Sequence, residues 1–430
     1  MLKEMKKNGL FIMIAVAAMM AVFACNKDTE PEVTPGETTE EEKEVEPEPP
    51  VYEVTAEKPY VNMQQLLDET GLLAALGGSG QIVIDVNFPD QGNPASAISY
   101  VYHSVDPQGK PVDLSAVIYI TTAALEGTTP LKGISLTNHG TIASNAQCPT
   151  NAAQFEGALA WKNYAIIMPD YYGFGKSSDR PQGYLDAENT ARNSIDAYIA
   201  AVELLKDREV EIPDNLYSLG YSQGGFNSMA NLKYVSEHPE LGISFSKVFC
   251  GGSPFDMELT WDKYTDGTFH NYLAFVPMTL VSINETQKLG LDYADLFKGA
   301  LLANYREWIL SKKYTTNEIS AFLSPDPKNP TPISAFLNDN LINRTGSAYD
   351  AIMSVVGRYS LTSGWVPSAG SSIFLFHSTQ DDTVPYDNLP AMTAFLDSVA
   401  GPDSYTVIDG EFGGHMDAVL WFILRTIGEW

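Results

Sequence analysis

The chain has few cysteines and few basic residues for its length. Three cysteines in 430 residues are too few for a disulfide scaffold. Cys148 and Cys250 could pair or remain free, and the apolar run that ends at Cys250 favours two buried thiols. Lys and Arg number 26 against 54 Asp and Glu, giving a formal net charge of −28. Such a chain repels polyphosphates, so we expect no nucleic acid partner.

The sequence also lacks the patterns of metal and dinucleotide sites. It contains no Cys-x-x-Cys, no His-Glu-x-x-His and no cluster of acids and histidines with ligand spacing. Gly173-Phe174-Gly175 lacks the third glycine and the helix start of a dinucleotide fingerprint. We therefore expect neither a metal nor a cofactor.

The first 25 residues have the layout of an export signal. Three lysines within the first seven residues precede an uncharged apolar stretch over 10–24. This stretch is shorter than the roughly 20 residues of a membrane-spanning helix. It ends in Val22-Phe23-Ala24-Cys25, which resembles a bacterial lipoprotein box with Cys25 as the lipidated residue. A plain signal peptide with an incidental cysteine is the alternative.

Residues 26–50 are rich in Glu, Thr and Pro and contain almost no large apolar residue. Such a segment cannot bury enough apolar surface to fold, and its like charges and prolines extend it. We expect an acidic tether over 26–50 and a folded domain from 51 onward. The predicted location is the bacterial cell envelope, periplasmic or surface-exposed, with the lipid on Cys25 as the only attachment to the outer membrane.

Beyond residue 50, short β-branched or aromatic runs alternate with helical stretches. The predicted strands cover 81–86, 98–102, 116–120, 132–136, 164–168, 215–219, 247–250, 372–376 and 405–408. Early strands without helices, followed by strand–helix alternation, predict an α/β fold with an antiparallel edge and a mostly parallel sheet covered on both faces. Segment 254–370 has helical and aromatic character, which predicts a mainly helical cap inserted between core segments 51–253 and 371–430.

A serine motif lies between one of these strands and a predicted helix over 226–238. Gly220-Tyr221-Ser222-Gln223-Gly224-Gly225 resembles the nucleophile elbow of the α/β-hydrolase fold, a sharp turn that holds a serine in strained backbone geometry. We predict Ser222 as the nucleophile and the backbone N–H of Gln223 as one oxyanion donor. The alternative is a glycine-rich turn with a passive serine.

The α/β-hydrolase order of serine, acid and histidine then selects two partners. Asp381 begins an Asp-x-x-Val-Pro sequence after the strand over 372–376, resembling the acid loop of many such hydrolases, whereas Asp382 is predicted to be a solvated neighbour. His415 is the only histidine after this acid. It would take the proton of Ser222 and return it to the leaving alcohol, while Asp381 would hold its tautomer.

Two further segments follow predicted strands. His139-Gly140-Thr141 resembles the oxyanion loop of the family, with Thr141 as the second donor; Gly140 or the Thr141 hydroxyl are alternatives, and His139 is predicted to be structural. The segment 170–175 is predicted to form a turn that shapes the pocket wall. Its aromatic residues could line an acyl or alcohol site; they are Tyr171, Tyr172 and Phe174.

Together these motifs resemble the secretory lipase-like branch of the α/β-hydrolases. The resemblance implies an esterase or lipase without cofactor or metal, acting on a small-molecule or glycan-linked ester. Five aromatic residues of the cap could form an acyl tunnel or belong to the core: Phe269, Tyr272, Phe275, Tyr293 and Phe297. A serine peptidase of the same fold and a catalytically silent surface binding protein are the alternatives. Acyl length, alcohol identity and oligomeric state stay open.

Overall fold

The computed structural model describes residues 51–71, 88, 91–269, 271–326 and 328–430. The predicted signal peptide, Cys25, the predicted tether and the predicted strand over 81–86 lie outside these residues. Within the described ranges, no helix is long and apolar enough to cross a membrane.

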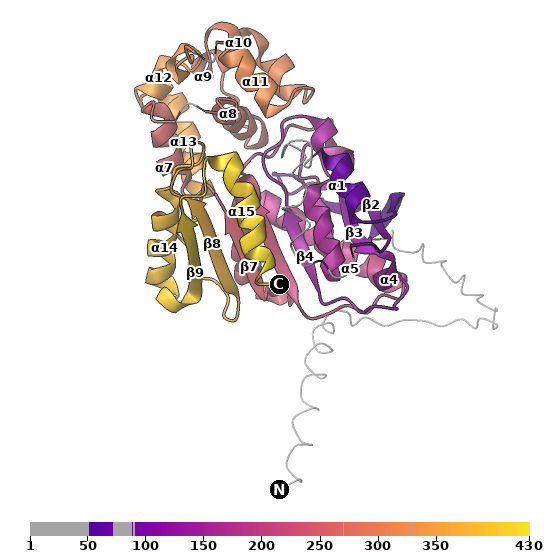
Figure 1. Ribbon diagram of the computed structural model, residues 1–430. Helices are drawn as coiled ribbons and strands as arrows, with labels where there is room; N and C mark the ends of the chain where they lie inside the picture. Colours follow the sequence, from indigo (N-terminus) through magenta and orange to yellow (C-terminus); the bar gives the residue numbers. More distant parts are fainter. Residues whose placement is uncertain (1–50, 72–87, 89–90, 270, 327) are drawn as a thin grey trace, which may run out of the picture. The chain divides into compact units, whose positions relative to one another are not determined.

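The described chain is built on one nine-stranded sheet with the order β1-β2-β3-β5-β4-β6-β7-β8-β9 (Figure 1). Strands β1, β2, β3 and β5 pair antiparallel, and the pairs from β5 to β9 are parallel. The predicted antiparallel edge and parallel sheet are therefore confirmed. The strands are β1 (Tyr52–Tyr60), β2 (Ala95–Val105), β3 (Pro111–Thr121), β4 (Gly133–Asn138), β5 (Tyr164–Pro169), β6 (Leu216–Tyr221), β7 (Lys247–Gly251), β8 (Ser372–Ser378) and β9 (Tyr405–Gly410).

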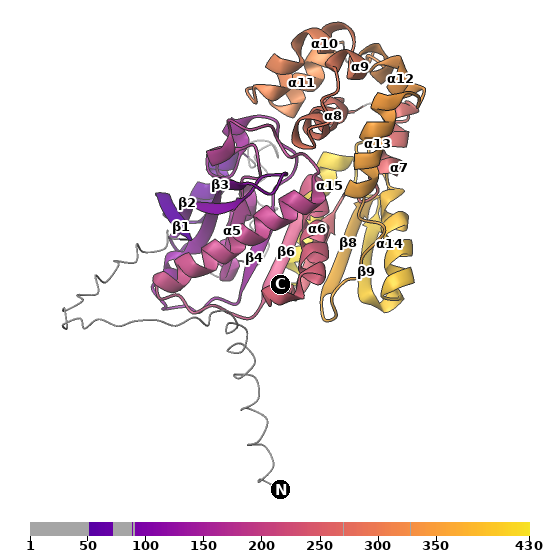
Figure 2. The ribbon, with the colours of Figure 1, turned by 180° about the vertical axis from the view of Figure 1, so that it is seen from behind.

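Helices cover both faces of the sheet, as the sequence predicted. Figure 2 shows α5 (Ala187–Asp207) and α6 (Gln223–Glu237) on one face, where they share a core with α14 (Asn388–Val399). Figure 1 shows α1 (Met63–Thr70) and α15 (His415–Ile427) on the other face, in a second core with the 3-10 helix over Phe155–Lys162. Strands β4, β5 and β6 are buried along their whole length, which explains their continuous apolar runs.

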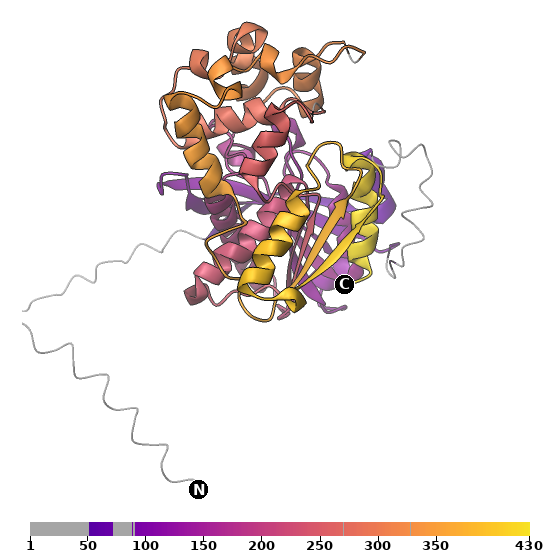
Figure 3. The same ribbon diagram turned by 90° about the vertical axis from the view of Figure 1, so that its left-hand side faces the viewer.

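The segment between β7 and β8 is helical and lies over one end of the sheet (Figure 3). That end carries the C-termini of the parallel strands, where this architecture places its sites. The helices of this cap are α7 (Met257–Thr265), α8 (Phe275–Thr286), α9 (Tyr293–Leu296), α10 (Gly299–Tyr305), α11 (Thr316–Leu323), α12 (Asp339–Ile342) and α13 (Ser347–Tyr359). A short helix α4 (Thr122–Leu125) follows β3.

One buried lysine ties the cap to the core. Lys312 follows α10, and its Nζ donates to the carbonyl oxygens of Gly173 and Ser178 at 2.6 Å each, and to that of Arg180. The cap is thereby fixed to the loop that follows β5. Cys148 and Cys250 are both buried and free, as the apolar run at Cys250 indicated.

Candidate active site

Ser222 sits at the sharp turn between β6 and α6. Its backbone has φ 59° and ψ −123°, a conformation that is costly for any residue with a Cβ. The turn is held from both sides, because the Ser222 N–H donates to the carbonyl of Gly251 at 2.7 Å and its carbonyl accepts from the N–H of Phe226 at 3.1 Å. The hydroxyl is therefore presented on a rigid, strained corner above the sheet.

The glycines around Ser222 are required by close backbone contacts. A Cβ added at Gly220 would collide with the backbone of Gly224, and one added at Gly224 would collide with the carbonyl oxygen of Asn138. Asn138 is the last residue of β4 and pairs with Gly220 across the sheet. The motif thus lets the strand end, the turn and the first turn of α6 approach without side chains between them.

Asp381 and His415 form a buried pair beside this turn. Asp381 Oδ2 lies 2.7 Å from His415 Nδ1, while Oδ1 accepts the backbone N–H groups of Thr383 at 2.9 Å and Val384 at 2.7 Å. Burial alone would raise the pKa of Asp381, but hydrogen bonds from His377 and His415 outweigh it and hold that pKa well below its usual range. Asp381 is therefore an anion that can orient an imidazole and stabilise its protonated form.

His377 is a second histidine at Asp381 that sequence reasoning assigned no role. Its Nε2 lies 3.3 Å from Asp381 Oδ2 and 3.2 Å from the carbonyl oxygen of Val384. A carbonyl oxygen only accepts, so Nε2 carries the proton. His377 Nδ1 is buried and has no partner among the described residues, so the ring makes its hydrogen bonds through Nε2 and donates to the carboxylate. The only sequence signal was a polar residue near the end of an apolar strand.

Asp382 is more than the solvated neighbour that the sequence predicted. It is exposed, but its Oδ1 accepts the backbone N–H of His415 at 3.0 Å, and its Oδ2 accepts from Asn271 Nδ2 at 2.8 Å. A carboxylate at this place also interacts favourably with the N-terminus of α15. The hydroxyl of Tyr221 donates to the carbonyl oxygen of His415 at 2.8 Å. Asp382 and Tyr221 therefore fix the backbone of His415, and Asp381 fixes its ring.

The predicted oxyanion donors, Gln223 and Thr141, each line a pocket together with Ser222. Gln223 is the first residue of α6, where a backbone N–H has no acceptor within the helix. Gly140 and Thr141 line one pocket together with Ser222 and His415. The Thr141 hydroxyl lies 3.1 Å from that of Tyr184 and is already engaged. This favours the backbone N–H of Thr141 over its hydroxyl as the donor.

His139 has the surroundings expected of a structural residue. It is buried, its Nδ1 lies 2.7 Å from the carbonyl oxygen of Gly140, and its ring stacks on Tyr171 with centroids 4.0 Å apart. Burial lowers the pKa of His139 to about 4, so the ring stays neutral near pH 7. His139 therefore supports the oxyanion loop, and we assign it no proton transfer.

The turn over 170–175 contributes no residue to the two pockets that Ser222 lines. Asp170 is fully buried and accepts from the hydroxyls of Ser115 at 2.5 Å and Thr150 at 2.6 Å. Burial raises the pKa of Asp170 to about 6. The aromatic side chains of the turn, which could have lined an acyl or alcohol site, are buried and line neither pocket beside Ser222; they are Tyr171, Tyr172 and Phe174.

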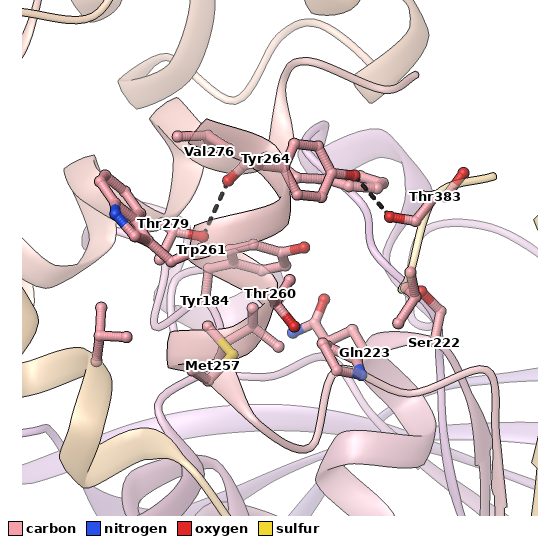
Figure 4. Close-up of a pocket in the computed structure, with 15 residues that line it drawn as sticks. Tyr184, Ser222, Gln223, Met257, Thr260, Trp261, Tyr264, Val276, Thr279 and Thr383 are labelled. Atoms are coloured by element: carbon pink, nitrogen blue, oxygen red, sulfur yellow. Dashed lines mark hydrogen bonds between the residues drawn. The ribbon is translucent and has the colours of Figure 1, made fainter. Parts of the chain in front are cut away.

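Ser222 lies on the walls of two pockets of different size. The smaller, of about 60 Å³, is apolar and lies under the cap (Figure 4). The larger, of about 310 Å³, also contains His415 and the oxyanion loop. No hydrogen bond joins Ser222 to His415 in the described part of the chain, although both line this pocket. Catalytic hydrogen bonds often tighten only when substrate binds.

The cap aromatics divide between the pockets and the core. Phe275 lines both pockets, and Tyr272 lines the larger one. Tyr293 and Phe297 instead pack against each other and against Tyr305. The remaining aromatic of the five, Phe269, packs on Tyr264. Two of the five residues named from the sequence therefore face the site.

Glu156 is a pocket residue that sequence reasoning missed. It lines the larger pocket from the first turn of the 3-10 helix over Phe155–Lys162. Its Oε2 is buried and has no hydrogen-bond partner among the described residues. Burial raises the pKa of Glu156 to about 7. Nothing in the local sequence distinguishes this glutamate from a surface residue, because only the fold brings it to the site.

Replacing Glu156 with glutamine is expected to stabilise the protein at high pH only. The pKa of Glu156 rises from 4.5 to about 7 on folding, so its contribution to stability is fully present below pH 4.5 and is lost as pH rises through 7. The difference in free energy of unfolding between Glu156→Gln and wild type should therefore rise in favour of the variant by on the order of 1–3 kcal/mol from pH 5 to pH 8.5. Urea titrations at both pH values measure it.

The exposed carboxylate of Glu126 provides the matched control. The difference in unfolding free energy between Glu126→Gln and wild type should stay the same at the two pH values. An equal lack of pH dependence for Glu156→Gln would show that the carboxylate is well solvated.

Comparison with known proteins supplies the family. The family model described as alpha/beta hydrolase fold matches residues 139–417. No curated protein sequence matches the chain. Similar solved structures include the rice cell wall degrading esterase LipA from Xanthomonas oryzae, at 18% identity and TM-score 0.69, over 87% of this chain and 95% of that one. Candida antarctica lipase A in its closed state gives 14% identity and TM-score 0.58, over 87% and 82%. At these identities the likeness shows the fold, and the predicted superfamily and fold class are confirmed.

Proposed function

The chain belongs to the α/β-hydrolase fold family, and from this premise we propose that it hydrolyses carboxylic esters through Ser222, His415 and Asp381. The observation that carries the proposal is the 2.7 Å contact of Asp381 with His415, whose ring shares a pocket with the strained Ser222. An esterase and a lipase with similar folds lend support, as their names assign them ester substrates.

The proposed reaction has two halves. Ser222 Oγ attacks the ester carbonyl carbon while His415 Nε2 takes the hydroxyl proton, and the resulting oxyanion accepts hydrogen bonds from the N–H groups of Gln223 and Thr141. The tetrahedral intermediate collapses, the carbon–oxygen bond to the alcohol breaks, and His415 returns the proton to the leaving oxygen. A water molecule, deprotonated by the same histidine, then releases the acid from Ser222.

The two pockets divide the ester between them. His415 must reach the leaving oxygen, and it lines only the larger pocket, so the alcohol part belongs there. The smaller pocket contains Ser222 and Gln223 but not His415, and it takes the acyl chain. Its walls are apolar, with Met257, Trp261 and Val276 among them, which suits a hydrocarbon chain (Figure 4).

The small acyl pocket predicts a preference for short acyl chains. Its volume of about 60 Å³ is about a fifth of the 310 Å³ of the larger pocket, so it favours a short hydrocarbon chain over a long one. Among p-nitrophenyl acetate, butyrate, octanoate and palmitate, we expect kcat/KM to be highest for butyrate and at least about 10-fold lower for palmitate. Initial-rate measurements on this series test the preference.

A variant of the pocket wall sharpens this test. Met257→Ala lengthens the acyl pocket and should shift the preference from butyrate towards octanoate. The same shift cannot come from a change in chemistry, because Met257 lies outside the triad. A wild-type enzyme that favours palmitate would contradict the assignment of this pocket and point to a long-chain lipase. Turnover of a proline-containing peptide anilide alone would point to a peptidase instead.

We also propose that the protein is exported and anchored by a lipid on Cys25. The proposal rests on the apolar stretch over 10–24, the lipoprotein-like box and the acidic segment over 26–50. Expression with an alkyne-labelled fatty acid in a bacterial host should label the wild type and leave Cys25→Ser unlabelled. A cleaved, unlabelled wild-type protein would instead identify a plain signal peptide.

A further inference from the structure

We propose that Glu156 binds the alcohol part of the substrate by accepting hydrogen bonds from its free hydroxyl groups. The preferred substrates would then be short-chain esters of polyols, such as glycerol or a sugar. This inference rests on the proposed ester hydrolysis at Ser222 and names the alcohol that the same site accepts.

The position of Glu156 is held by the fold. Two residues before Glu156, the backbone N–H of Gln154 donates to the hydroxyl of Tyr119 at 3.1 Å. Gly157 lies directly against the Tyr119 ring, so that an added Cβ there would collide with it. Further along the same helix, Trp161 Nε1 donates to the carbonyl of Asn93 at 2.8 Å. Glu156 therefore lines the pocket from a backbone that is fixed on both sides.

One oxygen of the carboxylate lacks a partner where one would be expected. Oε2 is buried without a hydrogen bond. The carboxylate interacts with its own backbone N–H, and no ion pair in the described part of the chain involves Glu156. A buried acceptor without a donor is costly. Such a group calls for a donor from water or from a bound molecule, and Glu156 lines the pocket that also contains His415.

The other polar groups of the pocket favour hydroxyls over a cation. Gln147, Gln154, Thr316 and Asn317 line the same cavity, and all are neutral side chains that can both donate and accept hydrogen bonds. Polyol hydroxyls have the same dual character. The cavity measures about 310 Å³ against about 60 Å³ on the acyl side, which is large enough for a sugar ring.

The test compares esters that share one acyl group. We expect wild-type kcat/KM to be higher for glycerol monobutyrate and for a glucose monobutyrate than for ethyl butyrate. Glu156→Ala should lower kcat/KM for the hydroxylated esters roughly 10- to 100-fold and for ethyl butyrate less than about 3-fold. Glu156→Gln keeps one acceptor oxygen, so its kcat/KM for the hydroxylated esters should lie between those of wild type and Glu156→Ala. Loss with only one of the two hydroxylated esters identifies whether glycerol or sugar is the alcohol bound.

Controls separate recognition from a structural role and from failure of the chemistry. Glu126→Ala removes an exposed carboxylate and should leave all ratios unchanged. The inference would be overturned, with ester hydrolysis intact, if Glu156→Ala lost kcat/KM equally on all esters or left the ratios of kcat/KM between esters unchanged. Butyrylcholine, an ester of a cationic alcohol, is added to the panel, and a selective loss with it alone would also overturn the inference. If wild type turns over no ester, calorimetry on Ser222→Ala tests the inference without the chemistry. Tighter binding of glycerol monobutyrate than of ethyl butyrate, lost when Glu156→Ala is added, would support it; equal affinities would overturn it.

Discussion

Ser222→Ala is expected to reduce kcat on p-nitrophenyl butyrate by roughly 10⁴-fold or more. The substitution removes the only atom that bonds to the substrate, and neither His415 nor Asp381 can replace it. Residual turnover should come from the oxyanion donors and from substrate positioning, with no covalent intermediate. Steady-state rates on the purified variant, beside wild type prepared identically, measure the effect.

The fold of this variant should be intact. Ser222 holds a strained backbone with φ 59°, and alanine carries the same Cβ, so the strain is unchanged and no buried hydrogen bond of the side chain is lost. We expect a circular dichroism spectrum and a urea midpoint close to those of wild type. Activity within about 10-fold of wild type, in a correctly folded variant, would remove Ser222 from the mechanism.

Asp381→Asn is the second large expected effect, with kcat lowered roughly 10³- to 10⁴-fold. The N–H groups of Thr383 and Val384 both donate to Oδ1, so the amide oxygen of asparagine must stay there. The amide nitrogen then takes the place of Oδ2 and donates to His415 Nδ1. The histidine is forced to carry its proton on Nε2, where it can no longer accept the proton of Ser222.

Asp382→Asn is the matched control for this prediction. Asp382 accepts the backbone N–H of His415, and an asparagine oxygen can still do so, which predicts a loss of less than about 10-fold. The two variants change neighbouring aspartates by the same chemical step. A larger loss in Asp382→Asn than in Asp381→Asn would identify Asp382 as the catalytic acid and contradict the assignment.

Most of the sheet could be predicted because its strands carry their own signal. Strands β4 to β8 are buried on both faces, so their sequences are continuous apolar runs bounded by turns. Strand β1 was missed because it is an edge strand whose residues are mostly exposed, and its charged residues interrupt any apolar run. The prediction over 81–86 lies outside the described residues.

The site was predictable where the chemistry depends on local sequence. The elbow needs glycines at 220 and 224 for steric reasons, and these leave a motif that can be read directly. His377, Asp382 and Glu156 were not predictable, because their roles depend on contacts between segments far apart in the chain. Pocket size is likewise a property of packing, which explains why the sequence left acyl length open.

Intact-mass and peptide mass spectrometry during turnover of p-nitrophenyl butyrate, quenched in acid, would detect an acyl group on Ser222. We predict a mass increase of one butyryl group, located on the peptide that contains Ser222. The adduct should be absent from Ser222→Ala and should appear far more slowly in Asp381→Asn. Ester turnover without any acylated peptide, or with the acyl group on another residue, would show that Ser222 is not the nucleophile.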